Sequence, residues 1–226
     1  GTHTFNVTKK DITFSGSRVY DATTTVSSSD LVTNDTTSGE TLAFSGSGTV
    51  SSANVQNNQS ITLGSIAIAD GSGGGLASNY NLTTGTFDIS QKWVSVGGQK
   101  IYDATTTVSS SDLEVTGEVT GESISITGTG SVTDKNVGSG KTIDISGLSL
   151  SDGSHSASNY TIGTTSFAIT RRNLSISGEK VYDGTGTVLA SQIDTVNTAG
   201  GETLTISGEG SISLPSVGTN KSITLN

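Results

Sequence analysis

The stretch Arg18-Val19-Tyr20-Asp21-Ala22-Thr23 decides the architecture because it returns twice. It reappears as Lys-Ile-Tyr-Asp-Ala-Thr at residues 100–105 and as Lys-Val-Tyr-Asp-Gly-Thr at residues 180–185. The three motif tyrosines are 82 and 80 residues apart. A fixed period is typical of a tandem array, so we expect modules of about 80 residues rather than one large domain.

Alternating apolar residues in each copy predict short strands. The pattern Glu-x-apolar-x-apolar-x-Gly occupies residues 40–46, 122–128 and 202–208. Period-2 alternation is typical of a strand with one buried face, and Gly- and Ser-rich turns separate the runs. We therefore expect an all-β fold, with an immunoglobulin-like β-sandwich in each module.

A polar stretch after each motif leaves a second fold open. Residues 28–31, 110–113 and 190–193 combine Ser, Asp or Gln with an apolar residue at the last position, which favours a single helical turn. The alternative to the sandwich is accordingly a β-grasp-like module with one short helix.

The repeats predict domain limits that are offset from the chain ends. We expect a closing strand of a preceding repeat in residues 1–10, repeat 1 in 11–90, repeat 2 in 91–170 and a truncated repeat 3 in 171–226. Residues 4–8 match the closing strands at 86–90 and 166–170. Because unpaired edges recruit strands, we expect residues 4–8 to join the first module or to pair with the open C-terminal edge of a neighbour.

The junctions between repeats are short and basic. Lys9-Lys10, Gln91-Lys92 and Arg171-Arg172 separate one closing strand from the next opening strand, without Pro or Gly. Such joins predict stiff connections between neighbouring repeats. We expect the basic side chains to be solvated at the strand crossing; the alternatives are a ligand-binding stripe or a processing site.

Composition excludes several classes of function. The net charge is −9 and the pI is near 4.5, which argues against nucleic acid and against attachment to anionic membranes. No apolar run approaches the length of about 18 residues needed for a transmembrane helix, so we expect no membrane insertion. The chain has no Cys, which excludes disulfides and a thiol nucleophile.

The Tyr-Asp motif has a structural and a functional interpretation. We expect each motif tyrosine to bury its ring and to hydrogen-bond its hydroxyl to the backbone, and each aspartate to form an Asx turn with the following Thr. The residues concerned are Tyr20, Asp21, Tyr102, Asp103, Tyr182 and Asp183. The recurring Ala-Ser-Asn-Tyr segments add Tyr80 and Tyr160 to this structural set.

The functional interpretation is a calcium site at Asp21, Asp103 and Asp183. Calcium requires several clustered oxygen ligands, whereas the motif supplies one carboxylate. Asp70 and Asp152 recur at later turns as candidate additional ligands. Calcium is the one cofactor for which the sequence supplies candidates; the expectation is that no cofactor is bound.

Catalytic constellations do not emerge from the sequence. His3 and His155 occupy unrelated places in the repeat, and no Ser/His/Asp set or recurring carboxylate pair accompanies them. The Asp134-Lys135-Asn136 loop resembles a metal loop in copy two only. We therefore expect no enzymatic activity. Trp93 also has no counterpart, so no aromatic platform for glycans recurs.

Three motifs in order resemble a known family. Lys-Val-Tyr-Asp-Gly-Thr (180–185), Asp-Lys-Asn-Val-Gly-Ser-Gly-Lys (134–141) and Ser-Asn-Tyr (158–160) are similar to the YDG-type repeats of large bacterial surface adhesins, including filamentous-haemagglutinin-like proteins exported by two-partner secretion. The loop at residues 52–59 departs from this pattern.

The resemblance implies a secreted or cell-surface segment that acts as a rigid, non-enzymatic stalk in cell adhesion or biofilm formation. Its first partners are the neighbouring repeats of the same chain. In the alternative, each module is a weak binding unit for a glycan, a matrix component or a host-surface protein, and acts by avidity.

Overall fold

The computed structural model describes residues 1–225. Its backbone is built from strands and single 3₁₀ turns, as the sequence predicted. Contacts divide the chain into two compact units. Unit 1 comprises residues 1–96, 114–127 and 148–164, and unit 2 comprises residues 97–113, 128–147 and 165–226. Each unit combines segments of two successive repeats.

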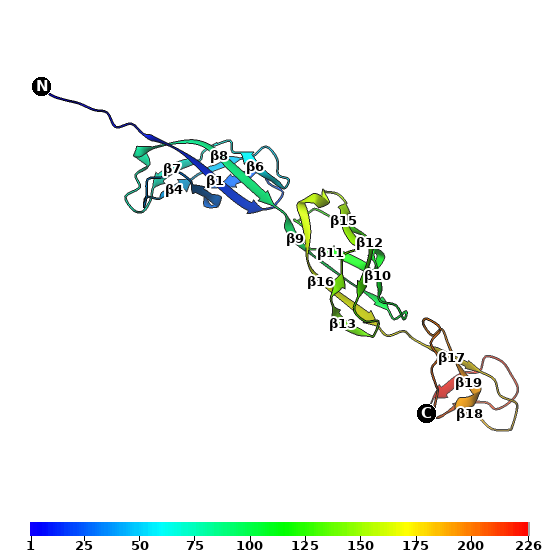
Figure 1. Cartoon of the computed structure of the whole chain (residues 1–226). Helices are drawn as coiled ribbons and strands as arrows, with labels where there is room; N and C mark the ends of the chain where they lie inside the picture. The colour runs from blue at the N-terminus through cyan, green and yellow to red at the C-terminus, as the bar shows by residue number, and fades with distance from the viewer. Residues whose placement is uncertain (226) are drawn as a thin grey trace. The chain divides into compact units, whose positions relative to one another are not determined.

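The first repeat contains eight strands and two 3₁₀ turns (Figure 1). They are β1 (Lys10–Val19), β2 (Thr25–Ser27), η1 (Ser28–Asp30), β3 (Leu31–Thr33), β4 (Leu42–Ser45), β5 (Ser47–Thr49), β6 (Gln56–Ser60), β7 (Ala67–Asp70), η2 (Ala77–Asn79) and β8 (Tyr80–Ser90).

The main sheet of this repeat is mixed. Its order is β3-β1-β8-β6, with β1 and β8 parallel at the centre and antiparallel strands on both sides. Two smaller antiparallel pairs, β2-β5 and β4-β7, complete the module. An immunoglobulin-like sandwich is composed of antiparallel sheets. The central parallel pair departs from that arrangement, and η1 is the short helical turn expected after the motif.

The second repeat has a similar succession of elements. They are β9 (Lys92–Ile101), β10 (Thr107–Ser109), η3 (Ser110–Asp112), β11 (Leu113–Thr116), β12 (Ile124–Val132), β13 (Gly138–Lys141), β14 (Ile143–Asp144), β15 (Leu148–Asp152), η4 (Ala157–Asn159) and β16 (Tyr160–Thr170). The single strand β12 takes the places of β4 and β5, and β14 has no counterpart among the named strands of repeat 1. The sheet order of repeat 2, β11-β9-β16-β13, repeats that of the first module strand for strand.

The third repeat contains β17 (Ser175–Gly178), β18 (Thr187–Leu189), η5 (Ala190–Gln192), β19 (Ile193–Val196), β20 (Glu209–Ile212) and β21 (Ile223–Leu225). The strand predicted at residues 202–208 does not form. Its counterparts β4 and β12 pair with β7 and β15. Among residues 1–225, no strand pairs with residues 202–208 in this way, although the alternating pattern is present.

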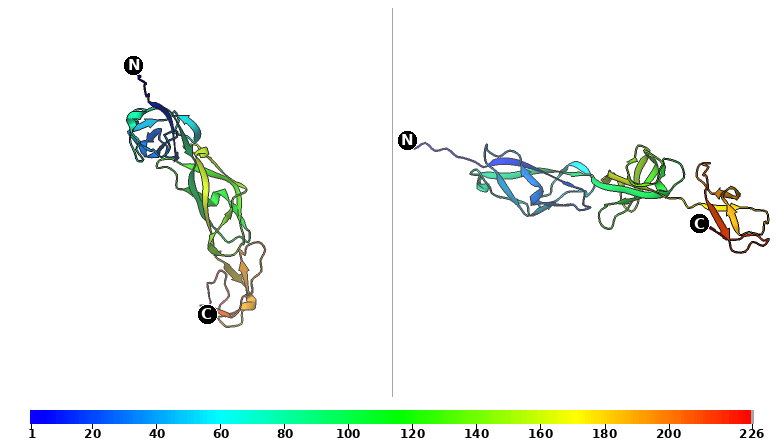
Figure 2. Two further views of the ribbon diagram at one scale, coloured as in Figure 1. Left: turned by 60° about the vertical axis from the view of Figure 1, so that its left-hand side comes forward. Right: turned by 90° about the horizontal axis from the view of Figure 1, so that it is seen from below.

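The N-terminal segment also differs from one expectation. Residues 1–9 form no strand and are exposed, so residues 4–8 do not join the first module (Figures 1 and 2). Pairing with the edge of a neighbouring chain remains a prediction.

The core of unit 1 packs around the two central strands. Phe14 of β1 and Phe87 and Ile89 of β8 are fully buried, and Val94 and Ile124 from repeat 2 belong to the same cluster. Gly16 of β1 is required by close approach, because a Cβ there would lie 2.5 Å from the Asp30 carbonyl oxygen of η1. The strand thus passes directly against the 3₁₀ turn.

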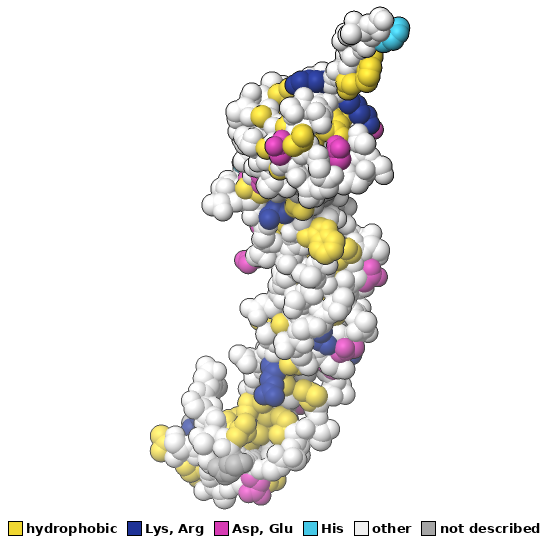
Figure 3. Space-filling view, turned by 90° about the vertical axis from the view of Figure 1, so that its left-hand side faces the viewer, with side chains coloured by type: hydrophobic (Ala, Val, Ile, Leu, Met, Phe, Trp, Pro, Cys, Tyr) yellow, Lys and Arg dark blue, Asp and Glu magenta, His cyan; other side chains and the backbone are white. Residues whose placement is uncertain are grey.

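Within the described residues, no helix is both long and apolar enough to cross a membrane. Charged side chains of both signs are dispersed over the face in Figure 3 and do not gather into a basic patch.

Candidate functional site: the repeated Tyr-Asp turn and the joints between repeats

The Tyr-Asp motif forms the same turn in all three copies. Asp21 Oδ1 accepts a hydrogen bond from the Thr23 N–H at 3.0 Å, and Asp103 and Asp183 accept equivalent bonds from Thr105 and Thr185, each at 2.9 Å. These are the Asx turns that the sequence predicted.

A basic residue three positions before the aspartate fastens each turn. Lys100 Nζ lies 2.9 Å from Asp103 Oδ1 and also donates to the Thr105 and Thr107 carbonyl oxygens at 3.0 and 2.6 Å. Lys180 repeats this arrangement, and Arg18 replaces it in copy one. Arg or Lys recurs at this position in all three copies of the sequence, but its role in the turn was not predicted.

The residue after the aspartate adopts a left-handed conformation. Its φ is 63° at Ala22, 65° at Ala104 and 78° at Gly184. This region suits glycine and costs an alanine about 1 kcal/mol. The third copy therefore carries the residue that fits the turn best.

The three motif aspartates, which were the candidate calcium ligands, are paired with basic side chains. Each carboxylate faces a side-chain cation, at 3.1 Å for Asp21 and at 2.9 Å for Asp103 and Asp183. The hydrogen bond from Lys180 holds the pKa of Asp183 at about 2. Asp70 and Asp152 instead accept from the Ala77 and Ala157 N–H groups. Over residues 1–225, no three acidic or histidine side chains converge on one point.

The motif tyrosine of repeat 1 does not bond the backbone as expected. Tyr20 is buried, and its hydroxyl donates at 2.8 Å to the Glu122 carboxylate, which belongs to repeat 2. Tyr160 donates to the other oxygen of Glu122 at 2.5 Å, and its ring meets that of Tyr20 edge-on at 5.5 Å. One carboxylate thus connects a tyrosine from each of two successive repeats. We call this cluster of Tyr20, Glu122 and Tyr160 the first joint.

Asn159 adds polar contacts to the first joint. Its side chain is 1% exposed. Its Oδ1 accepts from the Val55 N–H at 2.9 Å, and its Nδ2 donates to Asn54 Oδ1 at 3.0 Å. The Ser-Asn-Tyr motif of repeat 2 therefore supplies two neighbouring residues that contact repeat 1.

Burial changes the acidity of this cluster. Desolvation, together with the hydrogen bond to Glu122, raises the pKa of Tyr160 to about 12 and raises the pKa of Tyr20 as well. Both hydroxyls therefore stay protonated near neutrality and remain donors.

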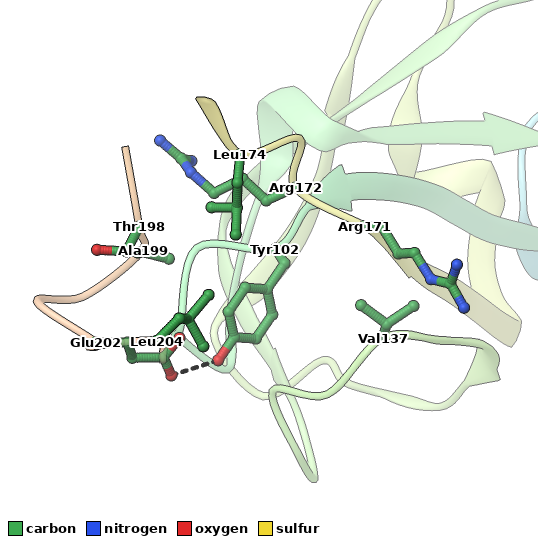
Figure 4. Close-up of a pocket in the computed structure, with 9 residues that line it drawn as sticks. All are labelled: Tyr102, Val137, Arg171, Arg172, Leu174, Thr198, Ala199, Glu202 and Leu204. Carbon is green, nitrogen blue, oxygen red and sulfur yellow. Dashed lines mark hydrogen bonds between the residues drawn. The ribbon is translucent and has the colours of Figure 1, made fainter. Parts of the chain in front are cut away.

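The second joint, in unit 2, has the same principal contact. Tyr102 donates to Glu202 at 2.5 Å (Figure 4), and Lys135 Nζ lies 2.8 Å from the same carboxylate oxygen. Lys135 also lies over the Tyr102 ring, 6.0 Å from its centroid. Donation from Lys135 and Tyr102 lowers the pKa of Glu202.

The loop that resembled a metal site takes part in this second joint. Asp134 lies 2.9 Å from Lys141 Nζ and accepts from the Asn136 N–H, while Lys135 reaches Glu202. The loop thus holds a lysine toward the next repeat.

A cavity opens beside Tyr102 at the second joint (Figure 4). Its walls are Tyr102, Val137, Arg171, Arg172, Leu174, Thr198, Ala199, Glu202 and Leu204. At the first joint, the ring of Tyr20, which corresponds to Tyr102, packs against Tyr160. Among residues 1–225, no second tyrosine lines the cavity beside Tyr102.

The remaining tyrosines of the set differ in their surroundings. Tyr80 repeats the role of Tyr160 inside its own repeat, since its hydroxyl bonds Glu40 and accepts from the Thr37 N–H at 3.0 Å. Tyr182, by contrast, is 63% exposed.

Two of the junction residues make specific contacts. Gln91 donates to the Ser158 and Tyr160 carbonyl oxygens at 3.0 and 3.1 Å, and Arg172 Nε donates to the Asn197 carbonyl oxygen at 2.6 Å. Each of these contacts lies within a single repeat, so these two side chains fasten the start of their own repeat.

One histidine, which has no counterpart in the other repeats, lies close to the first joint. His155 Nδ1 is 2.9 Å from Ser154 Oγ, and its Nε2 is 3.8 Å from Glu122 Oε1. The longer distance exceeds a hydrogen bond, and both Glu122 oxygens already accept from tyrosines. The trio therefore lacks the continuous relay that an activated serine requires.

Comparison with known proteins supports a chain of three repeats of about 80 residues. No curated protein and no solved structure gives a significant match. The model of the YDG domain matches residues 4–87, 91–167 and 170–226. Three consecutive matches cover almost the whole chain, and the chain therefore belongs to the YDG domain family.

Proposed function

We propose that this chain is a structural, non-enzymatic segment of an extracellular bacterial adhesin, in which it serves as a stiff stalk for cell adhesion or biofilm formation. The main support for this proposal is the hydrogen bond that connects successive repeats at each joint. A tyrosine of the Tyr-Asp motif in one repeat donates to a glutamate of the next, both from Tyr20 to Glu122 and from Tyr102 to Glu202.

Buried polar contacts oppose relative motion of neighbouring modules. Domains joined by small polar interfaces are expected to move. At the first joint, however, the Glu122 side chain is 5% exposed and accepts two hydroxyls, and Tyr20 and Tyr160 are as deeply buried. Bending the joint would expose these rings and leave a carboxylate with fewer partners, which costs about 1–3 kcal/mol per lost bond.

The extracellular setting rests on composition and on the resemblance to surface adhesins. The chain contains no Cys and is rich in Ser, Thr and Gly. A cysteine-free module cannot be trapped by disulfides before export. The use of the repeated motif residues in turns and joints supports a structural role.

Nuclear spin relaxation tests the stiffness. We expect amides of repeat 1 and of the adjoining part of repeat 2 to share one tumbling time, and Glu122→Ala to give them different values. Independent tumbling in the unmodified chain would contradict the stalk. Antibody labelling of intact cells that produce the full protein tests the location, since labelling only after lysis contradicts a surface role.

A binding role is the second candidate because of one aromatic side chain. Trp93 is 75% exposed and its ring lies over Gly163, where a Cβ would be 3.2–3.4 Å from the indole side chain. Such a fixed, exposed ring suits the apolar face of a sugar. A glycan and matrix array, read with and without calcium, tests this role. Binding that Trp93→Ala abolishes would support it.

A further inference from the structure

The exposed indole of Trp93 packs against a glycine of the neighbouring strand. Trp93 lies on β9, where it precedes the buried Val94, so its side chain is on the outer side of the sheet. A Cβ built at Gly163 of β16 would lie 3.2–3.4 Å from Trp93 Cβ, Cδ2 and Cε3. The absence of a side chain at Gly163 therefore leaves room for the indole against β16, while most of the ring faces solvent.

Repeat 1 fills the same place with other residues. Asp11 and Thr83 correspond to Trp93 and Gly163. Asp11 accepts a hydrogen bond from the Asn81 side chain at 3.1 Å, and the Thr83 hydroxyl donates to a backbone carbonyl oxygen of β1 at 2.8 Å. The module therefore forms without the tryptophan and the glycine, which occur together in repeat 2.

Hydroxyl groups lie beside the indole on the same side of the sheet. Ser95, two residues after Trp93 on β9, shares a hydrogen bond with Thr164 of β16, with 2.7 Å between the hydroxyl oxygens. The register of β1 with β3 in repeat 1 places Thr116 of β11 opposite Ser95. Successive outward residues of a strand are about 7 Å apart. A disaccharide with one ring on Trp93 can therefore reach these hydroxyls with its second ring.

The size and the chemistry of this patch favour a sugar over a protein. A stable protein interface buries about 800 Å² on each partner, whereas the apolar part of this patch is a single side chain among Ser, Thr and Gly. An aromatic ring receives the C–H face of a pyranose, and hydroxyls both donate to and accept from sugar hydroxyls. Glu114, which is exposed two residues before Thr116, opposes an acidic sugar.

We propose that Trp93, with Ser95, Thr116 and Thr164, forms a binding site for a neutral pyranose. Gluco- and galacto-configured hexoses fit best, because most of their ring hydroxyls are equatorial and their axial C–H groups form an apolar face. This inference deepens the second candidate function and depends on it, since it assigns the sugar class and the residues that contact it. It does not depend on the stalk.

The indole N–H signal of Trp93, the single tryptophan, reports binding directly in nuclear magnetic resonance spectra. Titration with cellobiose and with lactose to about 50 mM should shift this signal saturably, and glucuronate should shift it less. In saturation-transfer spectra, Trp93→Ala should weaken binding of both disaccharides at least about tenfold. An indole signal that neither disaccharide shifts, or that glucuronate shifts equally, would overturn the proposal.

Exchange of residues between repeats separates loss of the site from misfolding. Trp93→Asp/Gly163→Thr gives repeat 2 the residues of repeat 1 at both positions, so this chain should fold and should not bind. Asp11→Trp/Thr83→Gly should create a second site in repeat 1, where Thr13 corresponds to Ser95. We expect a second indole signal that the disaccharides also shift. Undiminished binding by the first variant, or a second indole signal that does not respond, would overturn the assigned site.

The outcomes also separate this site from the functions proposed above. Disaccharide shifts elsewhere in the chain with an unchanged Trp93 signal would support a binding role and overturn this site. An unchanged spectrum in a chain whose repeats tumble together would support the stalk and overturn this site.

Discussion

Removing one hydroxyl from each motif tyrosine tests the joint most directly. In Tyr20→Phe, Glu122 loses the donor at 2.8 Å but keeps Tyr160. A hydrogen bond to a charged group contributes about 1.5–3 kcal/mol. Because one donor remains, we expect the free energy of unfolding of unit 1 to fall by about 1–2 kcal/mol.

The other two motif tyrosines provide graded controls in the same chain. Tyr102→Phe should cost less than about 1 kcal/mol, because Glu202 and Lys135 are 35% and 44% exposed and stay paired. Tyr182 is 63% exposed, so Tyr182→Phe should stay within about 0.5 kcal/mol of the unmodified chain.

Urea unfolding gives the main measurement. Trp93, the single tryptophan, lies in unit 1 and reports its unfolding by fluorescence. With an m-value of about 2 kcal/mol/M, Tyr20→Phe should lower the midpoint by about 0.5–1 M. Because Tyr102 and Tyr182 lie in unit 2, which Trp93 does not report, amide hydrogen exchange in both units compares the three substitutions. An equal effect of all three substitutions, or a larger one for Tyr182→Phe, would refute the assigned role of the joint.

Four further predictions concern separate features. Asn159→Ala should destabilise unit 1 by about 1 kcal/mol in urea unfolding, because it leaves a partly buried N–H of repeat 1 without its acceptor; no change in midpoint would contradict this contact. Gly98→Ala places a Cβ 1.8 Å from a carbonyl oxygen and should lower the thermal midpoint by several degrees, whereas Gly138→Ala, with its nearest atom at 3.5 Å, should not. Ala104→Gly should raise stability by about 0.5 kcal/mol, because relief of the left-handed conformation outweighs the added chain entropy, and a loss in chemical unfolding would oppose this. Alkaline pH should weaken the first joint: the pKa of Tyr160 is raised to about 12 from an unfolded value of about 10, so its contribution is complete below pH 10 and is lost as the pH rises toward 12. Urea midpoints between pH 8 and 11.5 measure this loss, and Tyr160→Phe should reduce its slope.

Local features of the fold were predictable from the sequence because their causes are local. The period fixed the number of repeats, and the alternation located most strands. The Asx turn follows from an aspartate two residues before a threonine. The single helical turns at residues 28–31, 110–113 and 190–193 appear as η1, η3 and η5.

The joint was not predictable because its partners are far apart. Tyr20 and Glu122 are separated by 102 residues and lie in different repeats. Glutamate recurs at positions 40, 122 and 202, immediately before an alternating run, and that recurrence was the available signal. Alternation of apolar residues also does not show which strands become neighbours. The parallel pairing of β1 with β8 could therefore not be predicted from it. For the same reason, residues 202–208 have a strand pattern without forming a strand.

The two sides of a joint use different residues, so each repeat has two different ends. The motif tyrosine contacts the following repeat, while the glutamate and the Ser-Asn-Tyr residues contact the preceding one. An array of such units has a direction, and the tyrosine-to-glutamate contact recurs at both boundaries. Duplication or deletion of a whole repeat would therefore change the length of the array without requiring a new interface, and unequal recombination between copies offers a route to variants of different reach.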